Sequence, residues 1–198
     1  MATICVFGDS IAWGAVDPEN GGWVSCLRNY FESKSLRADL DTDVYNLGIS
    51  GDNTDDLLER FDVEVEARKP DTIVFAIGIN DAQFLIPQQR NRVPIDSFKQ
   101  NMITLIGKSK NSAKRTVLVG LTKVDEKKTT PIPWNLDKEY RNEHIQQYDS
   151  CLREISSTHS IDYIDLSRIL ANEDLADGLH PNTAGHKKIY EVVKTILG

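Results

Sequence analysis

The sequence predicts a single α/β domain built around a parallel β-sheet. Short runs rich in β-branched residues alternate with longer segments of helical periodicity, the pattern of repeated strand–helix–strand units. Two of the apolar runs are almost uninterrupted, as expected for strands that helices cover on both faces. At 198 residues the chain has the size of one domain, and no repeat or low-complexity linker divides it. We therefore expect residues 1–198 to form one domain.

Five segments are predicted as strands. Each is a short apolar run that contains β-branched or aromatic residues, the side chains that favour extended structure. The third and fourth runs are the most continuously apolar. The predicted strands are residues 3–7, 44–47, 72–77, 116–121 and 161–164.

Helices are predicted between these strands. Apolar residues at 57, 58, 61 and 65 share one helix face, and Asn53 or Thr54 could cap its start. The C-terminal segment repeats apolar residues at 189, at 192 or 193, and at 196, after a cap at Asn182 or Thr183. Three further helices are expected at residues 22–38, 95–112 and 138–158.

Two connections are longer than the roughly two to six residues usual between a strand and a helix. They span residues 81–94 and 122–137. Long loops at one end of a sheet often form the walls of a binding site. They could equally form a hydrophobic cover over the end of the sheet, and both interpretations stay open.

The composition is that of a globular protein, with 40% hydrophobic and 27% charged residues. The formal net charge is −7, and no run of Lys or Arg gathers the cations that a polyanion requires, so we expect no nucleic-acid partner. Cys5, Cys26 and Cys151 are too few and too scattered for a disulfide framework or a zinc site. We interpret them as core residues in a reducing compartment.

No apolar stretch approaches the ~20 residues of a membrane-spanning helix. The first apolar run, residues 4–7, is too short for a secretory leader and leads directly into Gly8. A cytoplasmic location is the simplest interpretation. The pattern does not indicate an oligomeric state.

Polar motifs begin where predicted strands stop. In an open parallel sheet the carboxyl ends of the strands lie along one edge, and ligands bind there. Residues far apart in the sequence are therefore expected to meet in one crevice. The four motifs are Gly8-Asp9-Ser10, Gly48, Gly78-Ile79-Asn80-Asp81 and Asp177-Gly178-Leu179-His180.

Ser10, His180 and Asp177 are the residue types of a serine nucleophile and its activating pair. A hydroxyl is a poor nucleophile until a neighbouring base removes its proton, and histidine can do this near neutral pH. Asp177 lies three residues before His180, so one short segment could present a carboxylate that orients the imidazole. We predict Ser10 as the nucleophile, His180 as the general base and Asp177 as the orienting carboxylate.

An oxyanion hole is predicted from three donors. The backbone N–H groups of Ser10 and Gly48 and the side-chain amide of Asn80 could bind the negative charge that develops on an attacked carbonyl. Gly48 has no Cβ, which would let backbone and substrate approach closely.

These motifs resemble the sequence blocks of the SGNH hydrolase superfamily, also called the GDSL esterases and lipases. Residues 6–11, 46–54, 78–81 and 177–185 match its blocks one, two, three and five in order, across nearly the whole chain. Ile11 stands where the family often has Leu, which keeps the position apolar. The resemblance implies a three-layer α/β/α sandwich with a five-stranded, flavodoxin-like parallel sheet. It also implies a mechanism that needs neither a metal nor an organic cofactor.

The expected function is that of a serine esterase that hydrolyses a carboxylic ester through an acyl-enzyme intermediate. The small-molecule substrate stays open among a lipid ester, a thioester and an O-acetylated sugar. An alternative is a non-catalytic binder of a phosphate or nucleotide, in which the loop 8–14 cradles the phosphate on a flavodoxin-like scaffold. This alternative leaves the coincidence of Asn80, Asp177 and His180 unexplained.

Several other residues are assigned structural roles. Ser50 also follows a predicted strand, but the Gly-x-Ser-x-Gly pattern of an α/β-hydrolase nucleophile is missing there. Asp9 and Asp81 are interpreted as hydrogen-bonding residues of their loops. Trp13 and Trp23 are assigned to the core or its cover, and Trp134 is the best candidate for a substrate wall. The histidines assigned to solvated or capping positions are His144, His159 and His186.

Overall fold

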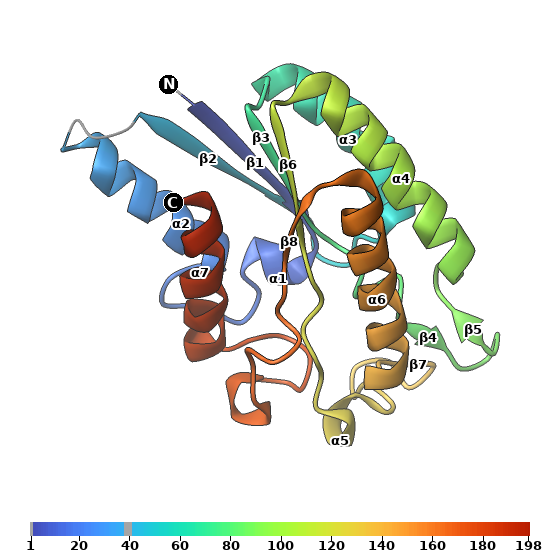
Figure 1. Ribbon diagram of the computed structural model, residues 1–198. Coiled ribbons are helices and arrows are strands. Elements are labelled where there is room, and N and C mark those ends of the chain that lie inside the picture. The colour runs from blue at the N-terminus through green and yellow to red at the C-terminus, as the bar shows by residue number, and fades with distance from the viewer. Residues whose placement is uncertain (1, 38–40) are drawn as a thin grey trace.

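The computed structural model describes residues 2–37 and 41–198 and contains the predicted five-stranded parallel sheet (Figure 1). The strand order is β2-β1-β3-β6-β8, and every neighbouring pair is parallel. This is the flavodoxin-like order, in which the chain first adds a strand on one side of β1 and then continues on the other. The strands are β1 (Ala2–Gly8), β2 (Thr42–Gly48), β3 (Thr72–Ala76), β6 (Arg115–Val119) and β8 (Asp162–Ile164).

Helices cover both faces of this sheet and make the three layers implied by the resemblance. Helices α2 (Gly22–Ser35) and α7 (Thr183–Leu197) pack against each other on one face. The other face carries α3 (Thr54–Arg68), α4 (Ile95–Ser112) and α6 (Asn142–His159), which lie side by side (Figure 1). The expected α/β/α sandwich is confirmed.

Strand β1 shows how the sequence produces two cores. Successive side chains of a strand point to opposite faces. Cys5 and Phe7 belong to the core under α3, α4 and α6, whereas Ile4 and Val6 belong to the core under α2 and α7. Because both faces are buried, the strand reads as continuously apolar rather than alternating.

The two predicted helix caps agree with the structure. The side chain of Asn53 accepts hydrogen bonds from the N–H groups of Asp55 and Asp56, and that of Asn182 accepts one from Gly185. Helix α4 has the predicted bounds, and α2 ends at Ser35, whereas the end predicted at residue 38 lies outside the described residues.

One position of a predicted helix stripe is wrong. Ile196 is exposed, and Leu197 is the residue of the last turn of α7 that is buried, so the apolar stripe ends one position later. Trp13, assigned to the core or its cover, is exposed, whereas Trp23 of α2 is fully buried in the core under α2 and α7. Among the cysteines, which are all free, Cys5 and Cys151 are buried as expected and Cys26 is only half-buried.

The first long connection pairs with the residues that directly follow the second, and together they form a small second sheet. Its three antiparallel strands, in the order β5-β4-β7, are β5 (Arg90–Asn91), β4 (Phe84–Leu85) and β7 (Lys138–Glu139). The helix predicted over 138–158 therefore begins only at Asn142, because residues 138–139 are used as a strand. The short helix α5 (Glu126–Thr129) lies in the second of these connections.

Within residues 2–37 and 41–198, no helix combines the length and the apolar character needed to cross a membrane.

Candidate active site

Ser10 lies at the junction between β1 and the four-residue helix α1 (Ser10–Trp13). The carboxylate of Asp9 caps this helix by accepting a hydrogen bond from Ile11 N–H at 2.9 Å, which is the structural role predicted for Asp9. Gly14 ends the helix with a φ of 98°, a conformation that favours glycine. The turn places the Ser10 hydroxyl at the carboxyl edge of the sheet.

The structure brings Ser10, His180 and Asp177 into one chain of hydrogen bonds. The Oγ of Ser10 lies 2.9 Å from Nε2 of His180, across 170 residues of sequence. On the other side of the imidazole, Nδ1 of His180 lies 2.7 Å from Oδ2 of Asp177. With Nδ1–H donating to the carboxylate, Nε2 is the ring atom free to accept the proton of the serine hydroxyl.

Asp177 is ionised and held in place by its own loop. Its Oδ1 accepts hydrogen bonds from the N–H groups of Leu179 at 2.9 Å and His180 at 2.8 Å. Burial alone would raise the pKa of Asp177, but hydrogen bonds from the side chain and backbone of His180 and from Leu179 N–H lower it to about 2. Gly178 allows this tight turn with a φ of 94°.

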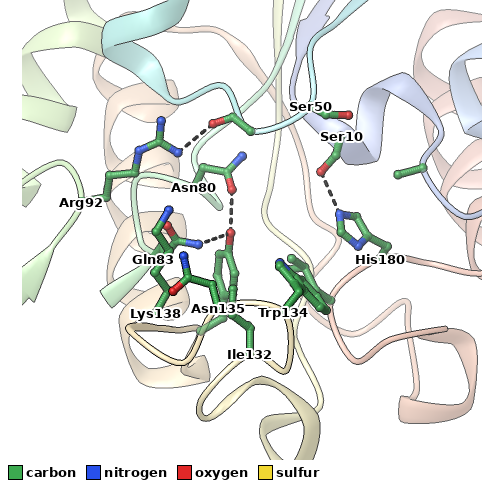
Figure 2. A pocket seen from close by; sticks show the side chains of 14 residues that line it. Ser10, Ser50, Asn80, Gln83, Arg92, Ile132, Trp134, Asn135, Lys138 and His180 are labelled. Carbon is green, nitrogen blue, oxygen red and sulfur yellow. Dashed lines mark hydrogen bonds between the residues drawn. The ribbon is translucent and has the colours of Figure 1, made fainter. Parts of the chain in front are cut away.

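Asn80 follows β3 and is buried beside this serine–histidine pair (Figure 2). Its Nδ2 donates to the backbone carbonyl of Asp52 at 2.9 Å, and its Oδ1 accepts from the hydroxyl of Tyr140 at 2.7 Å. The amide carries a second N–H, which has no partner among the described residues. Asn80 lines the same pocket as Ser10 and His180.

Gly48 is placed differently from the other predicted donors. Its N–H donates to Oδ1 of Asn46 at 3.0 Å, so a role in an oxyanion hole would require this proton to be shared. A Cβ on Gly48 would lie 2.4 Å from the backbone nitrogen of Trp13 and 2.8 Å from the carbonyl oxygen of Asp9. The absence of a side chain is thus explained by the close packing of α1 on β2.

A pocket of about 380 Å³ opens over these residues. Residues from both long connections line it, so these segments form walls of the pocket. The Trp134 indole, 54% exposed, stacks against the His180 ring with centroids 6.3 Å apart (Figure 2). The lining residues from the connections are Gln83, Arg92, Ile132, Trp134 and Asn135, and Lys138 of β7 joins them.

Several other predicted roles can be compared with the structure. Ser50 lines the pocket but is exposed and bonded to no base. Asp81 is buried and accepts hydrogen bonds from the backbone and hydroxyl of Thr54, which joins the start of α3 to the end of β3. The prediction for His186 is wrong: its side chain is fully buried and Nε2 donates to the carbonyl of Ala15. The described part of the chain contains no group of three or more metal-ligating side chains.

Sequence reasoning missed Gln83 and Tyr140. Both are buried polar residues that line the pocket. The Tyr140 hydroxyl donates a hydrogen bond to Oδ1 of Asn80, and Nε2 of Gln83 donates one to the Tyr140 oxygen. The only available signal was their position at the edges of the two long connections, because neither belongs to a motif.

The comparison with protein families agrees with this geometry. Residues 6–188 match the model of the GDSL-like Lipase/Acylhydrolase family. The chain belongs to this family. Family membership makes it a serine ester hydrolase, as the SGNH resemblance implied.

Individual relatives point the same way. An acetylxylan esterase from Geobacillus stearothermophilus is 26% identical over 90% of this chain and 86% of its own length. A lipase/acylhydrolase from Enterococcus faecalis superimposes with a TM-score of 0.80 at 25% identity, covering 100% of this chain and 95% of that one. A catalytic mutant of the Geobacillus stearothermophilus acetylxylan esterase superimposes with a TM-score of 0.76, covering 100% and 94%. At 22% identity, this last match supports the fold alone.

Proposed function

We propose that Ser10, His180 and Asp177 form a catalytic triad that hydrolyses a carboxylic ester through an acyl-enzyme intermediate. The observation that carries the proposal is the continuous hydrogen-bonded chain from the Ser10 hydroxyl through His180 to the Asp177 carboxylate. A serine, a histidine and a carboxylate in this order activate the hydroxyl without any further group.

The reaction follows from the positions of the protons. The Oγ of Ser10 attacks the carbonyl carbon, and its proton passes to Nε2 of His180. The tetrahedral intermediate then collapses, the bond to the alcohol oxygen breaks, and His180 returns the proton to that leaving oxygen. Water, deprotonated by His180, attacks the acyl-serine and releases the acid with free Ser10. Asp177 stays ionised throughout and stabilises the imidazolium.

The oxyanion is stabilised by fixed N–H groups. We assign this role to the backbone N–H of Ser10 and the free N–H of Asn80, with Gly48 N–H as a third donor if it shares its proton with Asn46. Donors that are already in place when charge develops lower the barrier, typically by about 3–4 kcal/mol for one donor.

For the substrate we propose a small acyl group, such as acetyl, on a hydroxylated alcohol of the sugar type. The pocket supports this because six of its 14 lining residues carry an amide or hydroxyl side chain, beside the exposed indole of Trp134. Hydroxyl groups of a sugar can bond to such side chains, and its ring can lie against an indole face. The activity stated for the Geobacillus relative, an acetylxylan esterase, agrees with this class. A cytoplasmic location stays a prediction, supported only by the free cysteines.

The test is hydrolysis of p-nitrophenyl acetate, butyrate and octanoate by the wild type and by Ser10→Ala. Ser50→Ala is the matched control, because Ser50 lines the same pocket without a base. We expect activity to disappear in Ser10→Ala, to persist in Ser50→Ala and to fall with chain length. Activity that survives in Ser10→Ala would identify a different nucleophile. A preference for octanoate would replace the sugar acetate by a lipid ester.

The non-catalytic phosphate or nucleotide binder finds no support. The loop 8–14 is occupied by the short helix α1, and the family of the chain consists of acylhydrolases.

A further inference from the structure

Asn80 can stabilise an oxyanion in only one of its two amide orientations. With Nδ2 toward the pocket, the side chain donates a hydrogen bond to the negative oxygen. With the amide turned over, Oδ1 would present its lone pairs to the same charge. The two orientations have nearly the same shape, so the hydrogen-bond partners of the amide decide between them.

Two partners hold the Asn80 amide, one at each of its polar atoms. Nδ2 donates to the Asp52 carbonyl at 2.9 Å, and Oδ1 accepts from the Tyr140 hydroxyl at 2.7 Å. Nε2 of Gln83 in turn donates to the Tyr140 oxygen at 2.7 Å. Asn80, Tyr140 and Gln83 are only 4%, 3% and 4% exposed, so bulk water does not compete for these bonds.

The bonds have a single direction. A phenol carries one proton, and because Gln83 already donates to the Tyr140 oxygen, this proton is left for Oδ1 of Asn80. Burial, with a smaller contribution from the charge of Asp9, raises the pKa of Tyr140 well above its usual range, so the hydroxyl keeps its proton. Gln83 therefore donates to Tyr140, Tyr140 donates to Oδ1 of Asn80, and the Asn80 amide keeps a free N–H in the pocket.

The small second sheet explains why Gln83 and Tyr140 meet. In its antiparallel register Phe84 pairs with Glu139, so the residues just before Phe84 and just after Glu139 come to lie opposite each other. Those residues are Gln83 and Tyr140. The backbone of Tyr140 is further fixed by two hydrogen bonds to Thr129, one from its N–H at 3.0 Å and one to its carbonyl at 2.8 Å.

We propose that Tyr140 is a positioning residue of the oxyanion hole: its hydroxyl, oriented by Gln83, selects the amide orientation in which Nδ2 of Asn80 faces the oxyanion. The proposal rests on the function assigned to Asn80 above. Tyr140 acts on the tetrahedral intermediate only through Asn80, so its loss affects the transition state more than the bound substrate.

The first test is Tyr140→Phe, which removes only the hydroxyl. We expect kcat on p-nitrophenyl acetate to fall about 10-fold with KM within about twofold, because an interaction made in the transition state is lost. The matched control is Tyr148→Phe, because Tyr148 is an equally buried tyrosine whose hydroxyl donates to the carbonyl of Val93, away from the pocket. Its melting temperature is expected to fall while kcat stays at the wild-type value. A wild-type kcat in Tyr140→Phe would overturn the proposal.

The second test asks whether Tyr140 acts through Asn80. In an Asn80→Ala background, Tyr140→Phe is expected to cause no further fall in kcat, since the group that it positions is gone. An equal fall in both backgrounds would show that Tyr140 acts elsewhere and would overturn the proposal. If Asn80→Ala itself leaves kcat unchanged, the oxyanion assignment fails, which is a different outcome from a failure of the positioning role alone.

Gln83→Leu supplies a variant that keeps the Tyr140 ring and hydroxyl. It removes the donor that orients the phenol, so we expect a smaller loss of kcat than in Tyr140→Phe, again absent in the Asn80→Ala background. If Tyr140→Phe fails to fold, this pair of measurements decides the question, and a wild-type kcat in Gln83→Leu then counts against the proposal.

Discussion

At the scale of single residues, the candidate site depends on short-range hydrogen bonds that each side chain can make in only one way. Asp177 is held by two backbone N–H groups of its own loop before it bonds to the imidazole. Its carboxylate therefore stays in position whether or not His180 carries a proton. Asn80 is held in a similar way, because both Nδ2 and Oδ1 of its amide have hydrogen-bond partners.

Asp177→Asn tests the proposed orienting role at this scale. The asparagine oxygen can still accept the two backbone N–H bonds, which leaves its NH₂ group facing Nδ1 of His180. That contact favours the tautomer with its proton on Nε2, which cannot accept the Ser10 proton. We expect kcat/KM for p-nitrophenyl acetate to fall about 10³- to 10⁴-fold with the folded structure retained. A loss smaller than tenfold would mean that Asp177 does not set the tautomer.

At the scale of elements, two packing features shape the candidate site at the carboxyl edge of the sheet. Helix α1 lies so near to β2 that only a glycine fits at position 48. Strands β4 and β5 of the connection 81–94 pair with β7, which directly follows the connection 122–137, and residues of both connections line the pocket. Both features are packing contacts, and both lie beside the candidate site.

Gly48→Ala tests the packing of α1 on β2. The new Cβ would lie 2.4 Å from the backbone nitrogen of Trp13, so backbone must shift, and we expect a loss of about 1–3 kcal/mol in the free energy of unfolding. The matched control is Gly107→Ala in the middle of α4, where a Cβ meets nothing within 4 Å. There we expect a gain of about 0.5–1 kcal/mol, because alanine favours the helix. Urea unfolding of both variants checks the pair, and equal effects would contradict the packing argument.

At the scale of the whole molecule, the fold buries carboxylates around the site with opposite consequences for stability. Burial raises the pKa of Asp9 to about 7, although the N–H of Ile11 and the charge of His180 oppose the shift. An acid with a higher pKa in the folded state binds its proton more tightly there, so stability falls as pH rises from 3.8 toward about 7. Asp177, with a pKa lowered to about 2, contributes stability that is present above 3.8 and lost as pH falls through about 2.

Asp9→Asn tests this dependence of global stability on pH. Asparagine keeps an oxygen for the N–H of Ile11 and cannot ionise, so we expect the decline in stability between pH 3.8 and about 7 to flatten. Urea midpoints at a series of pH values measure it. Asp137→Asn, at an exposed position, is the control and is expected to keep the wild-type slope. An unchanged slope in Asp9→Asn would mean that Asp9 ionises in its ordinary range.

The layers of this protein and the candidate residues for its chemistry can be predicted from the amino-acid sequence. Hydrophobic periodicity identifies the five strands and the main helices, since a strand that is buried on both faces is apolar along most of its length. Ser10 and Asn80 follow predicted strands and His180 lies beyond the last one, which indicates one crevice because parallel strands bring their carboxyl ends to one edge.

The residues that complete the site cannot be predicted in this way, because they meet only in the folded chain. Pairing between two-residue strands depends on segments about 50 residues apart, and such short strands have no periodicity that a sequence could show. For this reason Gln83 and Tyr140 were missed and the start of α6 was placed too early. The hydrogen bond from Gly48 N–H to Oδ1 of Asn46 likewise depends on how close the two groups lie in the folded chain. Sequence patterns record which residues are buried, whereas the partners of buried polar groups are chosen by the packed fold.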